Sequence, residues 1–205
     1  MKTIYTIGHS IYKIEEFGEL LKQNQINTIV DVRSTPYSKF APQYNKELLK
    51  QYLKQNAICY IYMGDMLGAR YEDKNLLFDD GKVNFKKVQE TKNFQDGILR
   101  LERGIDKGYN ISLMCSEKEA FDCHRFGLIS EFLSKILINI NHIYPDKIIP
   151  HKELEQRLLK KYEKKIPVVD LFHPNVSIEE QLKLAYELRN IDIAYNAITN
   201  EGDDE

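Results

Sequence analysis

Residues 28–36 read TIVDVRSTP, an apolar, β-branched run that ends in charged and polar residues and then in proline. Such a run predicts a buried β-strand over Thr28–Val32, and Pro36 disfavours a helix directly behind it. Further strand-like runs lie on both sides of this one, at Lys2–Ile7, Ile58–Met63, Asn110–Met114 and Asn139–Tyr144. The sequence therefore predicts five strands.

Apolar residues at helical spacing fill the segments between these strands. Helices are expected from Ile14 to Leu21, after Asn45, from Phe85 to Ile105 and from Arg125 to Ile136. Strands that alternate with helices are typical of a mostly parallel sheet that helices flank on both faces. We therefore predict an α/β fold that is Rossmann-like and three-layered.

The C-terminal part of the chain differs in character. Residues 152–165 are rich in lysine and glutamate, which is typical of a solvated helix face and leaves a phosphate-binding surface as the alternative. Ser177 and Glu180 form a capping-box pattern before another helix. We expect an α/β domain over residues 1–150 that carries the site, and a helical extension over residues 151–205. The extension either packs on that domain or meets a partner, and its acidic end EGDDE is expected to be disordered.

Composition limits the classes of function. The formal net charge of −2 gives no overall positive field for nucleic acid, although it is compatible with a local basic groove. Cys59, Cys115 and Cys123 lack the spacing of a disulfide framework, and Cys59 is expected inside a strand. No apolar run approaches the roughly 20 residues of a membrane span, and the N-terminus has no leader signature. We therefore expect a cytoplasmic protein with reduced thiols and no membrane partner.

Polar and reactive residues follow each of the first four predicted strands. Because parallel strands end at one edge of a sheet, where ligands bind in α/β folds, these residues are expected to share a crevice. The glycine-containing stretch 64–81 is longer than a connection requires and is expected to close over the ligand. The residues at the edge are Gly8, His9 and Ser10 after the first strand, Asp31, Arg33 and Ser38 at the second, Gly68 after the third, and Cys115, Glu117, Cys123, His124 and Arg125 after the fourth.

The residue types at this edge indicate an anion site. Arg33 and Arg125 would bind the anion together with free backbone amides at a helix start, which Asp122 is expected to cap. A phosphate-bearing small molecule or nucleic acid is the expected ligand. The other predicted ligand-binding residues are Gly8, Ser10, Ser38 and Gly68.

Acid–base and covalent chemistry could accompany this binding. His9 or His124 would move protons, because histidine titrates near neutrality. Asp31 or Glu117 would orient the cations or act as the base. The candidate nucleophiles are Cys115 and Cys123.

Structural roles are the alternative for the same residues. Asp31 and Arg33 could simply pair with each other, and His9 could be a core histidine. Cys115 could be inert packing at a strand end, and Arg125 could pair with a neighbouring glutamate.

A zinc site and a phosphatase loop are two other possibilities for residues 115–125. Cys115, Cys123 and His124 are possible zinc ligands, but zinc ribbons and fingers pair ligands two to four residues apart. Adjacent helical residues also point about 100° apart, so Cys123 and His124 are not expected to reach one ion, and we predict no metal. A phosphatase loop places five residues between its cysteine and arginine, whereas nine separate Cys115 from Arg125.

The chain resembles the uncharacterised family named domain of unknown function 488 (DUF488). The residues that carry the resemblance are Thr6-Ile7-Gly8-His9-Ser10, Asp31-Val32-Arg33 with Pro36 and Ser38, Leu67-Gly68, Cys115-Ser116-Glu117 and Cys123-His124-Arg125. The chain departs from the family pattern at Ala69, where a second glycine is common, and at Ala120-Phe121-Asp122, where a proline is common. The resemblance implies an α/β domain and brings no established reaction, cofactor or oligomeric state.

The leading interpretation is an enzyme-like crevice that acts on nucleotides or nucleic acid. The first alternative is a non-catalytic regulatory module that binds nucleic acid or a protein. The second is a thiol-based redox or sulfur-transfer enzyme, because Asp31-Val32-Arg33 after a strand is similar to the sulfurtransferase fold.

Overall fold

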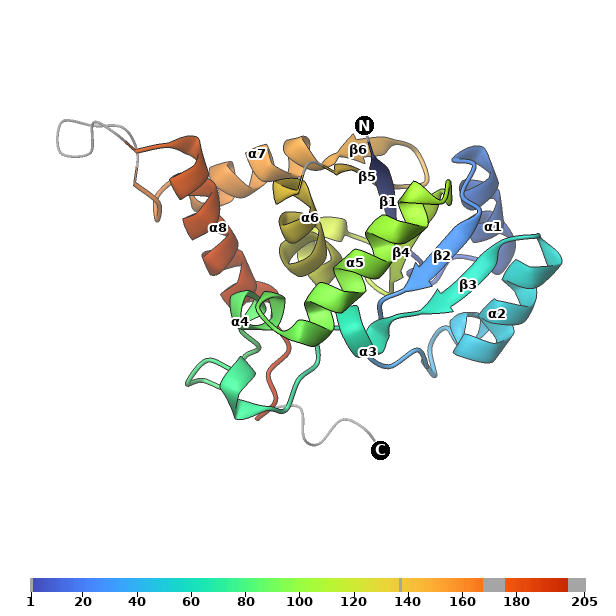
Figure 1. Ribbon diagram of the computed structural model, residues 1–205, viewed down its shortest axis with the longest axis horizontal. Coiled ribbons are helices and arrows are strands. Elements are labelled where there is room, and N and C mark those ends of the chain that lie inside the picture. Colours follow the sequence, from blue (N-terminus) through green and yellow to red (C-terminus); the bar gives the residue numbers. More distant parts are fainter. Residues whose placement is uncertain (1, 137, 168–175, 199–205) are drawn as a thin grey trace.

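The computed structural model of the protein describes residues 2–136, 138–167 and 176–198 (Figure 1). A six-stranded sheet with the order β3-β2-β4-β1-β5-β6 forms its centre, and the acidic end over residues 201–205 lies outside the described residues. The first five strands are parallel and β6 is antiparallel to β5. The predicted α/β fold is therefore confirmed. The strands are β1 Thr3–Gly8, β2 Thr28–Asp31, β3 Cys59–Tyr62, β4 Ile111–Cys115, β5 Asn139–Ile143 and β6 Ile148–Pro150.

Two hydrophobic cores cover the two faces of the sheet. On one face, helices α1 (Ile14–Gln23) and α2 (Lys46–Gln55) bury Phe17, Leu21 and Leu53 against the sheet. On the other face, α5 (Lys92–Asp106) runs in front of the strands (Figure 1) and packs Ile98 and similar residues on the sheet. Buried apolar stripes at helical spacing thus fix each helix to its face. The three layers predicted from the sequence follow from these two cores.

The strand register aligns the ends that carry the reactive residues. Gly8 of β1 pairs with Cys115 of β4, and Asp31 of β2 pairs with Met114 of the same strand. Strands β1, β4 and β2 are neighbours, so their C-terminal ends meet at one edge. The antiparallel edge strand β6 was not predicted, because a strand of three residues carries too little pattern to detect.

The connection from β3 to β4 differs from the prediction in two ways. The single helix expected from Phe85 to Ile105 is two helices, α4 (Phe85–Gln89) and α5, because Thr91 caps a new start and its hydroxyl accepts from the Phe94 amide. The expected irregular stretch 64–81 contains the short helix α3 (Gly64–Leu67).

Cys59 was expected to be shielded within a strand, but β3 lies at the sheet edge and this thiol is exposed.

The C-terminal helices pack back onto the sheet domain. Helices α7 (His151–Tyr162) and α8 (Ile178–Ile193) form a core with Phe121 and Phe126, which lie just after β4. The predicted capping box is present at the start of α8. A π-helical turn over Arg125–Ser130 continues into α6 (Glu131–Lys135) beside these helices. Within the described residues, no helix combines the length and apolar character that crossing a membrane requires.

The chain returns across the molecule after α8. The amide of Val83 donates to the Tyr195 carbonyl at 3.0 Å, and the amide of Ala197 donates to the Gly81 carbonyl at 3.0 Å. Residues 194–197 therefore lie along the stretch that precedes α4. This brings the end of the described chain close to the loops that follow β2 and β3.

Candidate functional site

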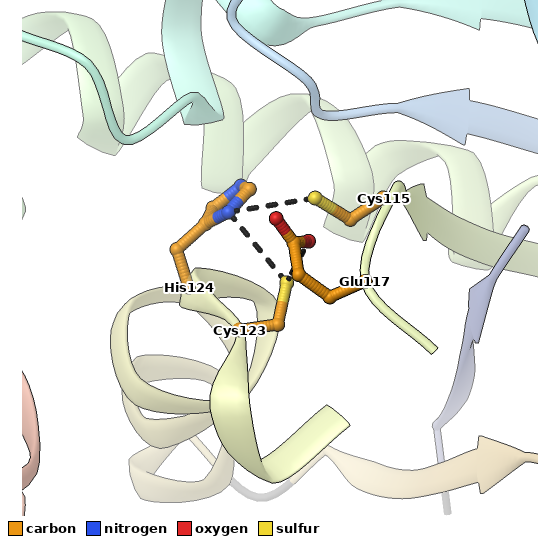
Figure 2. A group of neighbouring side chains, drawn as sticks. All are labelled: Cys115, Glu117, Cys123 and His124. Atoms are coloured by element: carbon orange, nitrogen blue, oxygen red, sulfur yellow. Dashed lines mark hydrogen bonds between the residues drawn. The ribbon is translucent and has the colours of Figure 1, made fainter. Parts of the chain in front are cut away.

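Four side chains of the stretch after β4 gather at the C-terminal edge of the sheet (Figure 2). Cys115 ends β4, Glu117 follows two residues later, and Cys123 and His124 open the next helical segment. Each offers one ligand atom, and these atoms all lie within 4.8 Å of one another. His124 Nδ1 lies 3.6 Å from the Cys115 sulfur and 3.7 Å from the Cys123 sulfur. The Cys123 sulfur and Glu117 Oε2 share a hydrogen bond of 3.0 Å.

Arg125 holds the loop that presents Glu117. Its side chain is 1% exposed, and its guanidinium donates to the carbonyl oxygens of Glu117 at 2.7 Å and Lys118 at 3.0 Å. A buried guanidinium with several fixed donors is well suited to organise such a loop. Arg125 was expected to bind an anion, but its guanidinium is directed at the protein backbone.

Asp122 does not cap the helix that follows, contrary to the prediction. It belongs to a 3₁₀ turn over Ala120–Asp122 and forms an ion pair with Arg189 of α8. The backbone of Cys123 is extended (φ −129°, ψ 149°), its carbonyl accepts from the amides of residues 126 and 127, and its sulfur accepts from the Arg125 amide at 3.4 Å. Cys123 therefore occupies the capping position, because the turn before it shifts the helix start by one residue.

The shifted helix start allows Cys123 and His124 to face one metal ion. The sequence argued against a shared ion because both residues were expected in a helix, where neighbours point about 100° apart. With Cys123 extended and His124 helical, the two side chains converge on the same point (Figure 2).

Hydrogen bonding fixes the tautomer of His124. Its Nε2 lies 3.1 Å from the Val32 carbonyl, which can only accept, so Nε2 carries the proton. In the neutral ring, Nδ1 then directs its lone pair at the two sulfurs. The residue that follows β2 thus orients a side chain that follows β4.

The electrostatics of the cluster separate the two thiols. Burial and the neighbouring Cys123 raise the pKa of the Cys115 thiol well above its ordinary value. Burial has the same tendency at Cys123, but the Cys115 hydrogen bond and the charges of Arg125 and His124 outweigh it and hold its pKa well below the ordinary value. Desolvation and Cys123 raise the pKa of the Glu117 carboxyl. Negative charge therefore concentrates on the Cys123 sulfur.

A cleft of about 250 Å³ opens beside the cluster. Segments far apart in the sequence form its walls: Arg33–Thr35, Ala69–Arg70, Cys115–Glu117, Asp122–His124 and Ile193–Tyr195. The guanidinium of Arg70 lies 5.1 Å from the ring centroid of Tyr195. The wall formed by Ile193–Tyr195 was not predicted, because no local pattern near Tyr195 indicates where that segment packs.

A larger groove of about 550 Å³ lies between α4, α6 and α8. Its lining is mostly apolar with lysine and glutamate side chains at its rim, and it includes none of the predicted site residues. The smaller cleft is therefore the better candidate for chemistry.

Comparison with known proteins supports the family resemblance. Residues 13–133 match a family model described as Domain of unknown function DUF488. The chain belongs to the DUF488 family. The matched part of this DUF488 chain includes the four clustered side chains, whereas β1, α7 and α8 lie outside it. No curated protein and no solved structure is significantly similar to the chain.

The predicted site residues of this DUF488 protein divide into two groups. The cleft brings together Arg33, Cys115, Glu117, Cys123 and His124. The remaining predicted residues lie outside its lining and contact the protein around it. These are Gly8, His9, Ser10, Asp31, Ser38, Gly68 and Arg125.

Arg33 forms hydrogen bonds with both Asp31 and His9. Asp31 is fully buried and receives hydrogen bonds from Arg33 Nε at 2.9 Å and Nη2 at 2.6 Å. His9 donates from Nδ1 to the Ser10 carbonyl at 2.7 Å, accepts from Arg33 Nη1 at 3.1 Å and stacks on Tyr44. Burial and the Arg33 charge lower the pKa of His9 to about 4, so it is neutral at physiological pH.

The predicted glycines and serines of the DUF488 site shape its loops. A Cβ at Gly8 would lie 1.8 Å from the Glu117 carbonyl oxygen, and one at Gly68 would lie 2.3 Å from the Gly64 carbonyl oxygen. The Ser10 amide donates to the Ser116 carbonyl at 2.9 Å. The Ser38 hydroxyl accepts from the amides of residues 40 and 41 at 3.2 and 3.3 Å. These residues position the strands and loops that carry the cluster.

Proposed function

We propose that the C-terminal sheet edge binds single-stranded nucleic acid. The observation that carries the proposal is a set of exposed apolar and aromatic side chains on the two loops that follow β1 and β2. Phe40 is 93% exposed, Tyr37 is 62% exposed and Ile11 is 77% exposed. Several exposed apolar side chains on two adjoining loops are typical of an interaction surface.

The loops hold these side chains in place. The amide of Ser38 donates to Asn45 Oδ1 at 2.7 Å, which fixes the turn between Tyr37 and Phe40. The side-chain amide of Gln43 (Nε2) and the hydroxyl of Tyr44 both donate to the Tyr12 carbonyl, at 3.0 and 3.1 Å, and so join the two loops. The backbone that carries the exposed rings is therefore held in place, so little loop entropy is lost when a base stacks on them.

The charge of these loops favours a polyanion. Residues 8–13 and 32–46 contain no aspartate or glutamate, while Lys39 lies between the exposed Tyr37 and Phe40. Arg70 adds an exposed guanidinium at the cleft. Stacking platforms interleaved with cations are typical of proteins that bind single strands. Because the overall charge is −2, the attraction between these cations and the nucleic acid is expected to be local and to weaken with added salt.

Fluorescence anisotropy with a labelled 12-nucleotide single strand tests the proposal. Phe40→Ala and Tyr37→Ala should each weaken binding roughly 5- to 150-fold, because stacking on one base is worth about 1–3 kcal/mol. Tyr109→Ala is the matched control, since Tyr109 is 49% exposed and precedes β4 at the opposite sheet edge. Equal affinity for a duplex, equal loss in the control, or absence of binding would each count against the proposal.

A further inference from the structure

We propose that Cys115, Cys123 and His124 bind one Zn²⁺, and that Glu117 accepts a proton from a water molecule in the fourth coordination position. The proposal adds a catalytic centre to the nucleic-acid site proposed above. The zinc site itself does not depend on that ligand.

The spacing of the three side chains fits a tetrahedral zinc ion. With Zn–S bonds of about 2.3 Å and Zn–N bonds of about 2.0–2.1 Å, sulfur and nitrogen ligands lie about 3.6 Å apart. His124 Nδ1 lies 3.6 and 3.7 Å from the two cysteine sulfurs. The two sulfur–nitrogen distances therefore match those around a tetrahedral ion, and all the ligand atoms lie within 4.8 Å of one another.

The surroundings supply the support that zinc ligands require. The Nε2 proton of His124 is directed at the Val32 carbonyl at 3.1 Å, an outer contact that leaves Nδ1 free for metal. The Arg125 amide lies 3.4 Å from the Cys123 sulfur and can stabilise a thiolate there. The charges of two thiolates and Glu117 then balance those of Zn²⁺ and the buried Arg125 guanidinium. Two thiolates and an imidazole also favour zinc over magnesium or calcium.

The fourth position faces the cleft. Cys115 and Cys123 are buried, whereas the Glu117 side chain is 47% exposed and lines the cleft. Structural zinc sites are closed by four protein ligands, while catalytic sites keep one position for water. With zinc bound, the ion holds the Cys123 sulfur as a thiolate, so Glu117 is the carboxylate that can take a proton from the zinc-bound water.

The ligand set favours attack on carbon over attack on phosphorus. Two thiolates neutralise the ion, so it stabilises the added charge of a phosphoryl transition state less well than the oxygen-rich, paired metal sites of phosphodiesterases. Glu117 follows the ligand Cys115 by two residues, the spacing at which a glutamate moves protons in zinc deaminases with cysteine and histidine ligands. The substrate class is accordingly an aminated nucleobase within a single strand.

The proposed step balances in atoms and charge. Zinc-bound water transfers a proton to Glu117, and the hydroxide forms a C–O bond at the ring carbon that bears the amino group. Glu117 passes the proton to the ring nitrogen, and protons then move to the amino group as its C–N bond breaks. The products are the keto base and ammonia, with no oxidant or reductant required.

The first experiment measures metal in the full-length chain. The purified protein should hold about one zinc per chain, and Co²⁺ exchange should give the visible absorption of a tetrahedral thiolate site. Cys123→Ser should lose both, whereas Cys59→Ser should keep both, because Cys59 is exposed at the start of β3. A folded wild type without zinc or cobalt bands overturns the site. So does equal metal content in the two variants. Thiols that react in the wild type without metal would support the thiol enzyme instead.

The second experiment separates the ion from the reaction. Glu117→Gln should retain zinc and lower ammonia release from a single strand at least roughly 100-fold, the usual effect of losing a general base. Loss of zinc in this variant would identify a closed structural site and overturn the water position. Strand cleavage without ammonia would overturn the reaction class. Binding of the single strand by Cys123→Ser tests the nucleic-acid proposal without the metal. Failure of nucleic-acid binding can therefore be told apart from failure of the zinc site.

Discussion

A buried histidine chain should make the stability of this protein fall in mild acid. Thr6 Oγ1 lies 2.8 Å from His142 Nδ1, His142 Nε2 lies 3.1 Å from His151 Nδ1, and His151 Nε2 lies 3.0 Å from the Tyr186 hydroxyl. Tyr186 in turn donates to Glu155 at 3.3 Å. This order requires both imidazoles to be neutral with the proton on Nε2, because each Nδ1 accepts.

Protonation of either ring would break this order. An added proton on His151 Nδ1 would face the Nε2 proton of His142. Burial lowers the pKa of His151 to about 3, and burial, His151 and Arg125 lower the pKa of His142 well below its ordinary value. Glu155, 3.7 Å from His151, is the nearest opposing charge. The folded state therefore resists a proton that the unfolded chain accepts near pH 6.5.

The sign and the size of the effect follow from proton linkage. Below about pH 6.5 the unfolded state binds more protons than the folded state, so the free energy of unfolding decreases as pH falls, down to the folded pKa. At pH 4.5, His151 alone should cost about 2.7 kcal/mol relative to pH 7.5, from a limiting slope of about 1.36 kcal/mol per pH unit. His142 acts in the same direction.

Urea unfolding of the metal-free protein, followed by far-UV circular dichroism between pH 7.5 and 4.5, measures this slope. His151→Gln should remove the contribution of one histidine to the slope, whatever the free energy of unfolding of this variant at pH 7.5. Lys160→Gln on the exposed side of α7 should keep the wild-type slope. An unchanged slope in His151→Gln would refute the reasoning, as would a wild-type stability that is constant down to pH 5.

Three further changes probe the site and its supports. Gly8→Ala should lower the free energy of unfolding by about 1–3 kcal/mol in urea titrations, because its Cβ would meet the Glu117 carbonyl at 1.8 Å; wild-type stability would refute the close approach. Arg189→Met should cost about 2 kcal/mol and speed hydrogen exchange in the 3₁₀ turn, since it removes the ion pair to the half-exposed Asp122 and a buried bond to a backbone carbonyl; unchanged exchange there would contradict this. Tyr195→Ala should weaken single-strand binding roughly threefold in anisotropy titrations, as expected for loss of one cation–π or stacking partner, and full affinity would show that this wall does not touch the strand.

Local sequence patterns were sufficient for most of the fold. Strand β2 was predicted because β-branched residues with a proline behind them have few alternatives to a buried strand. The capping box of α8 was equally local, since Ser177 and Glu180 lie within one helical turn. The break between α4 and α5 was missed because the capping hydroxyl of Thr91 is a weak signal inside a segment with continuous helical spacing.

The candidate site was predicted in part for the same reason. The parallel order of the strands places Cys115 and the residues after β2 at one edge, so their proximity follows from strand order alone. The direction of each side chain does not follow from order. Arg33 and Arg125 were expected to face a ligand, yet Arg33 pairs with the buried Asp31 and Arg125 donates to two backbone carbonyls.

What the sequence determined by itself is the set of chemical groups and the edge of the sheet on which they gather, because strand order and helical spacing are encoded by short-range patterns. Only the tertiary structure decided the directions of these side chains and which of them meet in the cleft. A one-residue shift in a helix start, held by Arg189 from a helix more than sixty residues away in the chain, leaves Cys123 extended and lets it meet His124. Tyr195 reaches the cleft through packing of the C-terminal helices. Such contacts depend on the summed burial of distant surfaces, and no local pattern records that sum.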